Sequence, residues 1–288
     1  MIAIIGATGT IGQALLERLR DVDVPVRALS REPGKLRHRL EAQRRSAVEI
    51  AAADASDPDS LRRAFAGADQ VFFALSNSPD QVKEESAIIQ SAAESGVRHL
   101  VKISSPLFEP SAPVAVAGWH GEIEKVLKNS GLDYTVLRPY AFMQNLFGLA
   151  PTIAAQNGFF GIMGDTPCNF VDCRDIADAA AEVLTRPGRR GGIYTLTGSE
   201  TYSYPQIASR LSEILNRPIR YIHMEPAELL HHLTERARMP LWLANHVVEI
   251  QTLSMKVPER PTDSIKQLLG RAPRTLDAFL QEYADRFR

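Results

Sequence analysis

Short apolar stretches alternate with amphipathic stretches along the first half of the sequence. The apolar runs predict strands at residues 2–5, 25–29, 47–52, 70–75, 98–103 and 133–137. Between them, apolar residues recur at helical spacing and predict helices near residues 11–20, 33–43, 58–66, 80–95 and 119–130. This alternation is typical of a parallel sheet covered by helices on both faces. We therefore expect an α/β fold built on a doubly wound parallel sheet.

The pattern changes in the second half. A helix at 174–186 and a strand at 193–197 continue the alternation, and a helix at 204–215, a strand at 219–223 and helices near 226–237, 240–256 and 274–287 follow. We expect residues 1–150 to form one domain, to which strands within 168–197 return. Residues 151–288 should form a smaller, mixed, mainly helical lobe over the cleft. Helix 240–256 is expected to line the mouth of the cleft or to form an oligomer contact.

The first strand runs directly into a cluster of glycines that opens a helix. Gly6, Gly9 and Gly12 have GxxGxxG spacing, with Ile11 and Leu15 following at helical spacing. Unpaired amides of a first helical turn attract a diphosphate, and glycines allow the backbone to approach it. This predicts a Rossmann-type dinucleotide site. The residues expected to contact the cofactor are Gly6, Ala7, Thr8, Gly9, Thr10, Ile11 and Gly12. The alternative is an ordinary strand–turn–helix junction.

The end of the second strand indicates which dinucleotide binds. A carboxylate at this position accepts hydrogen bonds from a free ribose hydroxyl, whereas an arginine binds a 2′-phosphate. The chain has Ser30 and Arg31 here, with Lys35 one helical turn further on. Because guanidinium is shaped for paired hydrogen bonds to phosphate, we expect NADP(H) to be preferred over NAD(H). The neighbouring Glu32 leaves open that Arg31 is a solvated charge.

Polar residues follow the fourth and fifth predicted strands. Leu75 and Ser76 lie at the end of one, and Ser104 and Ser105 follow the other. Ligands in open α/β sheets lie beyond the carboxyl ends of the strands. We therefore expect Leu75, Ser76 and Ser104 to contact the cofactor and Ser105 to contact the substrate. Lys102 alternates with apolar neighbours in the fifth strand, so it should reach the rim or find a partner.

Several motifs resemble one branch of the short-chain dehydrogenase/reductase superfamily. Residues 6–12 read Gly-Ala-Thr-Gly-Thr-Ile-Gly, 119–127 read Trp-His-Gly-Glu-Ile-Glu-Lys-Val-Leu, 130–139 read Ser-Gly-Leu-Asp-Tyr-Thr-Val-Leu-Arg-Pro, and 142–145 read Phe-Met-Gln-Asn. Together with residues 171–177, these resemble the NmrA-like branch of atypical members, over most of the chain to about residue 200. The branch includes NAD(P)H-dependent quinone and dye reductases and redox-sensing regulators. The resemblance also implies that Asp54 accepts from the adenine amino group, although Asp54 is equally plausible as a turn residue.

One departure from the superfamily concerns its proton donor. Ordinary members carry Tyr-x-x-x-Lys at the start of the helix near 119–130, and the resemblance places Val116 and His120 at those two positions. The tyrosine is therefore absent. His120 is the candidate catalytic residue, because it could hydrogen-bond a ribose or substrate oxygen or give a proton near neutral pH. The alternative is a histidine packed beside Trp119.

Residues after the sixth strand should surround the substrate. Pro139 is expected beside the cofactor, and Tyr140, Phe142 and Asn145 are expected to form the substrate pocket. Phe159, Phe160 and Met163 are further candidates for its wall. The alternative is that these aromatic and methionine side chains belong to the core.

Composition excludes several other classes. The formal net charge of −1 gives no electrostatic basis for binding nucleic acid or an anionic membrane. No apolar run approaches the roughly 20 residues that span a bilayer, and the first strand begins at Met1, so a cytoplasmic location is expected. Cys168 and Cys173 are too few for a disulfide framework, and the adjacent His231 and His232 cannot share a helix face as metal ligands. We expect no metal.

Taken together, the motifs predict an NADPH-dependent oxidoreductase that transfers hydride to a small conjugated electrophile such as a quinone. Such an acceptor can take its protons from water, so a missing tyrosine is tolerable. The partner would be a small-molecule electron acceptor, and the protein a monomer or homodimer. The alternative is a non-enzymatic, NAD(P)-binding redox sensor. A sugar-nucleotide epimerase is disfavoured because that chemistry needs the tyrosine.

Overall fold

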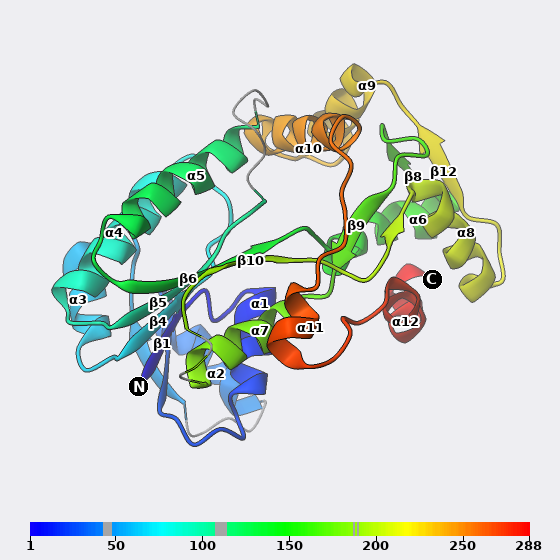
Figure 1. The fold of residues 1–288 in the computed structure, drawn as a ribbon. Helices are drawn as coiled ribbons and strands as arrows, with labels where there is room; N and C mark the ends of the chain where they lie inside the picture. Colours follow the sequence, from blue (N-terminus) through cyan, green and yellow to red (C-terminus); the bar gives the residue numbers. More distant parts are fainter. Residues whose placement is uncertain (43–47, 107–113, 187, 189) are drawn as a thin grey trace.

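Seven parallel strands form the central sheet (Figure 1), in the order β10-β6-β5-β4-β1-β2-β3. The computed structural model describes residues 1–42, 48–106, 114–186, 188 and 190–288. The strands are β1 (Ile2–Ile5), β2 (Val26–Ser30), β3 (Glu49–Ala52), β4 (Gln70–Phe73), β5 (His99–Ile103), β6 (Asp133–Pro139) and β10 (Ile193–Leu196). The strand order reverses between β1 and β4, which is where ligands bind in sheets of this kind.

Helices cover both faces of this sheet because its strands bury side chains on both sides. Ile2 and Ile4 pack on one face and Ala3 and Ile5 on the other. The first face is covered by α1 (Thr10–Arg18), α2 (Pro33–Ala42), α7 (Cys173–Thr185) and α11 (Ser264–Leu269). The second is covered by α3 (Pro58–Phe65), α4 (Gln81–Glu94) and α5 (Ala115–Lys128). The expected Rossmann-type, doubly wound α/β fold is confirmed.

A second lobe has its own aromatic core, in which Phe147 lies against Phe279, Tyr283 and Phe287. It contains two small sheets, one of β7 (Ala141–Phe142), β9 (Cys168–Val171) and β11 (Thr201–Tyr202), and one of β8 (Gly158–Gly161) and β12 (Arg220–His223). Its helices are η1 (Met143–Leu149), α6 (Ala150–Gln156), α8 (Tyr204–Leu215), α9 (Pro226–His231), η3 (His232–Arg236), α10 (Leu241–Ser254), α12 (Leu276–Glu282) and η4 (Ala284–Phe287). Figure 1 shows α10 spanning from the end of α5 toward this lobe.

Most predicted elements of the central sheet coincide with observed ones within a few residues, but the second lobe is more varied than expected. The short strands β7, β8, β9 and β11 and the helices α6 and α11 were not predicted. The expected helix 226–237 is α9 followed by a π-helical turn, and 274–287 is α12 followed by a 3-10 turn. Residue 43 of the predicted helix 33–43 and residue 47 of the predicted strand 47–52 lie outside the described residues. The division at residue 150 stays a proposal.

The contacts that tie the lobes together include a buried carboxylate and a pair of tryptophans. Asp175 in α7 is fully buried and accepts hydrogen bonds from the Arg271 guanidinium and the Arg274 backbone N–H, each at 2.7 Å. At the opposite side, Trp119 of α5 lies against Trp242 of α10, with ring centroids 6.3 Å apart. No helix among the described residues is both long and apolar enough to cross a bilayer.

Candidate active site

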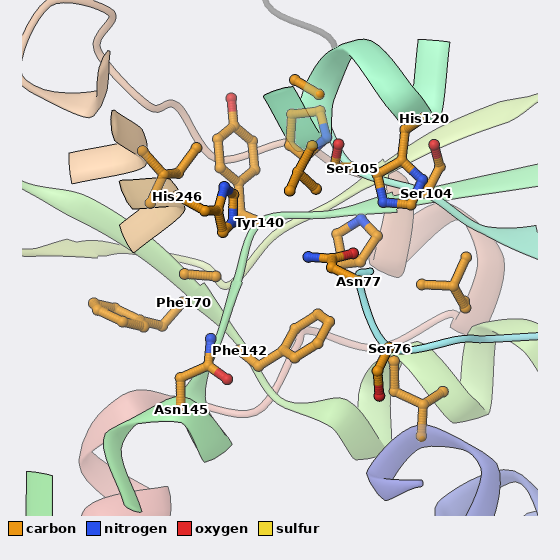
Figure 2. Close-up of a pocket in the computed structure, with 18 of the residues that line it drawn as sticks. Ser76, Asn77, Ser104, Ser105, His120, Tyr140, Phe142, Asn145, Phe170 and His246 are labelled. Carbon is orange, nitrogen blue, oxygen red and sulfur yellow. The ribbon is translucent and has the colours of Figure 1, made fainter. Parts of the chain in front are cut away.

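A cavity of about 520 Å³ lies at the carboxyl ends of the central strands, between the first helical turn of α1 and the second lobe. Figure 2 shows its side chains converging from several elements. It brings together most of the residues predicted from the sequence, namely Gly6, Gly9, Thr10, Ile11, Gly12, Leu75, Ser76, Ser104, Ser105, His120, Pro139, Tyr140, Phe142 and Asn145.

The glycine loop at one end of the cavity is shaped for close backbone approach. Gly6 has φ +83°, and a Cβ there would lie 2.1 Å from the carbonyl oxygen of Ala74. A Cβ on Gly12 would lie 2.1 Å from the carbonyl oxygen of Gly6, so α1 can pack against the loop only without a side chain at position 12. Gly9 precedes the helix and supplies no capping side chain, and no acidic residue lies in the first turn. These amides suit an anion such as a diphosphate.

The remaining predicted cofactor residues lie outside this cavity. Ala7 is fully buried in the core and can contribute only its backbone. Thr8 and Arg31 are exposed at the amino end of α1 and the carboxyl end of β2, respectively. The Ser30 hydroxyl accepts from the Glu32 backbone N–H at 3.1 Å, and Lys35 pairs with Glu32 at 2.5 Å. The Arg31 guanidinium is therefore more available to bind a phosphate than the Lys35 ammonium is.

Asp54 adopts the turn role that the sequence left open. Its carboxylate accepts from the backbone N–H and the hydroxyl of Ser56, at 2.9 and 2.8 Å. The Ser56 backbone hydrogen bond is the main cause of the lowered pKa of Asp54. Its expected contact with adenine stays a prediction.

His120 forms part of the cavity wall and is backed by a buried charge. Its Nδ1 lies 3.2 Å from Nζ of Lys102, which is paired with Glu85. Burial, reinforced by the positive charge of Lys102, holds the pKa of His120 well below its usual value. The imidazole is therefore neutral at physiological pH, which argues against the imidazolium proton donor that the sequence allowed. Lys102 has found a partner rather than reaching the rim.

Ser104 is held by a neighbouring ion pair. Its hydroxyl donates to Glu124 at 2.6 Å, and the same carboxylate accepts from Nε of Arg138 at 3.0 Å. Glu124 on α5 and Arg138 on β6 thus fix the tip of β5, where Ser104 and Ser105 meet the cavity. The Ser105 hydroxyl is buried and has no hydrogen-bond partner within the described part of the chain. It can receive a polar ligand group.

The sequence profile of the NmrA-like family matches residues 1–280. This chain belongs to the NmrA-like family. It is 33% identical over 290 residues to NAD(P)H azoreductase of Xenophilus azovorans, covering 100% of this chain and 99% of the relative. It is 32% identical to the (4-alkanoyl-5-oxo-2,5-dihydrofuran-3-yl)methyl phosphate reductase of Streptomyces griseus, with 100% and 99% covered. It also resembles the structure of an NADPH-dependent quinone oxidoreductase from Escherichia coli complexed with NADPH, with a TM-score of 0.88, 27% identity and 98% and 99% coverage. The predicted family resemblance is confirmed.

The wall of the cavity farthest from the glycine loop comes mostly from residues that the sequence did not single out. Asn77, Tyr204, His246, Gln251 and Glu259 line it together with Met163 and Phe170. Asn77 directly follows the predicted Ser76, and Met163 is one of the predicted wall residues; Tyr204, His246, Gln251 and Glu259 lie more than 50 residues beyond Asn145, and no motif marks them. Phe159 and Phe160, by contrast, do not line the cavity: Phe159 is a core residue, and Phe160 packs on His232.

Glu259 is a half-buried carboxyl group at this far wall. It accepts from the Asn169 backbone N–H at 2.5 Å and from the Ser254 hydroxyl at 3.0 Å, which links the end of α10 to β9. Burial raises its pKa. Burial likewise lowers the pKa of His246, whose Nδ1 has no hydrogen-bond partner among the described residues. This end of the cavity thus combines apolar side chains with a few hydrogen-bonding groups.

One further residue was missed at the nucleotide end. Nη1 of Arg39 in α2 donates to the Thr8 carbonyl at 3.2 Å and so lies beside the glycine loop. Lys35 and Arg39 are four residues apart in α2, a spacing that places side chains on one face of a helix, and Arg31 precedes the helix. That regularity could have identified Arg39 from the sequence. No group of three or more His, Cys, Asp or Glu residues suited to a metal occurs in the described ranges.

Proposed function

We propose that this protein uses a nicotinamide dinucleotide to reduce small conjugated electrophiles such as quinones. One observation carries the proposal. The same cavity is lined at one end by the uncapped first turn of α1 and at the other by apolar side chains, which we call the substrate chamber. The relatives are an azoreductase, a furan-ring reductase and a quinone oxidoreductase. At the level of reaction class, the predicted NAD(P)H-dependent oxidoreductase is confirmed.

The residues present suit the cofactor. Thr10, Ile11 and Gly12 would hold the diphosphate through their backbone amides, and Leu75, Ser76 and Pro139 would flank the rest of the molecule. When bound, the reduced nicotinamide supplies a hydride. Tyr140, Phe142 and Phe170 then exclude water and orient a flat acceptor, as apolar and aromatic walls do in small-molecule sites.

We propose further that NADP(H) is preferred over NAD(H). No carboxylate stands at the end of β2, where it would bind a ribose hydroxyl. Arg31 is exposed there, and Arg39 lies at the same end of the site beside Thr8. Two guanidinium groups near one phosphate would form strong, charge-assisted hydrogen bonds.

The test measures consumption of NADPH in the presence of a panel of quinones and azo compounds. Loss of the NADPH absorbance band reports the rate. Turnover with at least one acceptor, faster with NADPH than with NADH, is expected. Tight NADP(H) binding without turnover of any acceptor would instead favour the redox sensor, because the absent tyrosine is compatible with both. The cytoplasmic location and the monomeric or homodimeric state are further proposals, which fractionation and light scattering would check.

A further inference from the structure

Four polar side chains form a buried cluster directly behind the cavity wall. Gln81 and Glu85 come from α4, Lys102 from β5 and His120 from α5, with exposed fractions of 0%, 1%, 0% and 6%. Only His120 of the four lines the cavity, and the proposed function has so far given none of them a role. A buried ion pair often contributes no more stability than apolar residues of similar volume, so stability alone does not explain this one.

The hydrogen bonds of Lys102 decide how His120 is protonated. An ammonium group has three hydrogens and no acceptor. Nζ of Lys102 directs them to the Glu85 carboxylate, to the Ile103 carbonyl at 3.2 Å and to Nδ1 of His120 at 3.2 Å. Nδ1 must therefore be the unprotonated nitrogen, and the single hydrogen of the neutral ring lies on Nε2.

The Nε2 hydrogen is available to a ligand. The amide nitrogen of Gln81, 3.3 Å from both ring nitrogens, is a donor and cannot accept this hydrogen; in the Nε2–H tautomer its own hydrogen can be accepted only by Nδ1, which it shares with Lys102. That amide donates to Glu85 at 2.9 Å, which further fixes the carboxylate. The ring borders the cavity beside Ser105, and His246 faces it from the opposite side (Figure 2).

We propose that the Glu85–Lys102 pair is a positioning device that holds His120 as the Nε2–H tautomer and so presents a hydrogen-bond donor to the substrate. A neutral imidazole N–H can polarise a carbonyl in this way. The substrate class is then a hydride acceptor with a carbonyl oxygen or an azo nitrogen conjugated to the reduced atom. Hydride brings two electrons to the substrate, negative charge develops on that heteroatom, and water supplies the proton while His120 keeps its own. This inference rests on the proposed function.

The first test measures the tautomer and does not depend on turnover. Nitrogen-15 NMR of the protein labelled at its seven histidines, with His120→Gln to assign the signal, should show an unprotonated Nδ1 and a protonated Nε2. The variant Lys102→Met/Glu85→Gln removes both charges together and should lose this preference. A wild-type Nδ1–H tautomer, or the same Nε2–H tautomer in both proteins, would overturn the proposal.

The second test is a kinetic cycle. The paired variant should lower kcat with a quinone roughly 10- to 100-fold, less than the roughly 100- to 10,000-fold contributed by a group that transfers its proton, because His120 only donates a hydrogen bond; the Kd for NADPH should change by less than about twofold. In a His120→Ala background the same replacement should change kcat by less than about twofold, because Lys102 acts only through His120. Equal losses in both backgrounds would show general damage to the sheet and refute the positioning role.

A matched control lies on the same strand. His99 in β5 is also fully buried and hydrogen-bonded, to Gln70 and Thr135 at 3.0 Å, but it does not line the cavity. His99→Gln should leave both the His120 tautomer and kcat unchanged while perturbing the sheet. Should the wild-type protein reduce no acceptor at all, the proposed function fails, and the NMR measurement still decides the tautomer.

Discussion

At the scale of single residues, three cationic side chains near the carboxyl end of β2 have different surroundings, namely Arg31, Lys35 and Arg39. Lys35 forms an ion pair with Glu32, and Arg39 donates a hydrogen bond to the Thr8 carbonyl. No hydrogen bond or ion pair engages Arg31 within the described ranges, although its charge contributes to the lowered pKa of Asp54. Arg31 is thus the side chain that can meet a 2′-phosphate without first breaking another contact.

Arg31→Ala should therefore weaken binding of NADPH far more than binding of NADH. Loss of a charged hydrogen bond is expected to reduce the binding free energy by about 1.5–3 kcal/mol. Fluorescence titration of each coenzyme measures this. Lys35→Ala is the matched control and should have a smaller effect, because its ammonium is already paired. An equal loss for NADPH and NADH in Arg31→Ala would show that Arg31 does not bind the phosphate.

At the scale of elements, the loop between β1 and α1 depends on glycine where α1 packs on it. Gly12→Ala would place a Cβ 2.1 Å from the Gly6 carbonyl oxygen. Overpacking of this kind should lower the free energy of unfolding by about 1–3 kcal/mol and displace the amides that bind the diphosphate. Urea unfolding and NADPH titration measure the two effects.

Gly34→Ala provides the contrast, because a Cβ at position 34 in α2 would meet no atom within 4 Å. It should stabilise the helix by up to about 1 kcal/mol, since alanine is the better helix former. If both alanine variants bound NADPH like the wild type, the tight packing of α1 on the loop would have no role in the site.

The site residues that the sequence predicted lie at the ends of predicted elements, whereas those it missed approach the cavity from other elements. The glycine loop and the strand tips were predictable because local patterns mark them and because the carboxyl ends of parallel strands meet at one edge of the sheet. His120 was predictable only through the resemblance to the NmrA-like branch. The partner of Lys102 was not, because Glu85 approaches from a helix packed on the sheet. Helix 240–256 was expected at the mouth of the cleft, and α10 does line the cavity, but helical periodicity did not indicate that His246 faces it. Glu259 was missed because it follows α10 in a segment without periodic signal.

At the scale of the whole molecule, a coenzyme that joins the two lobes should stabilise the native state. At a concentration of 100 times its Kd, NADPH should add about 2.7 kcal/mol to the free energy of unfolding. For a chain of this size that corresponds to a rise in Tm of roughly 5–10 °C. Thermal unfolding with NADPH and NADH at equal concentration checks this, and a Tm unmoved by either would remove the basis for both the reductase and the sensor.

Acid stability should depend on His99. Burial lowers the pKa of His99 from 6.5 to about 4. The unfolded chain therefore takes up a proton between these pH values while the folded protein does not, so stability is lost as pH falls through that window. The full pKa shift corresponds to a loss of about 3 kcal/mol in the free energy of unfolding. Urea unfolding of the wild type and His99→Gln across this range should give a shallower decline for the variant; parallel curves would contradict the assignment.

The Trp119–Trp242 contact has a practical consequence. The chain has two tryptophans, and they meet where α5 of the central domain touches α10, the helix that borders the chamber. Any rearrangement of α10 when an acceptor enters must change how these two indoles couple. The near-ultraviolet circular dichroism of the unlabelled protein should therefore report a movement of α10 against α5.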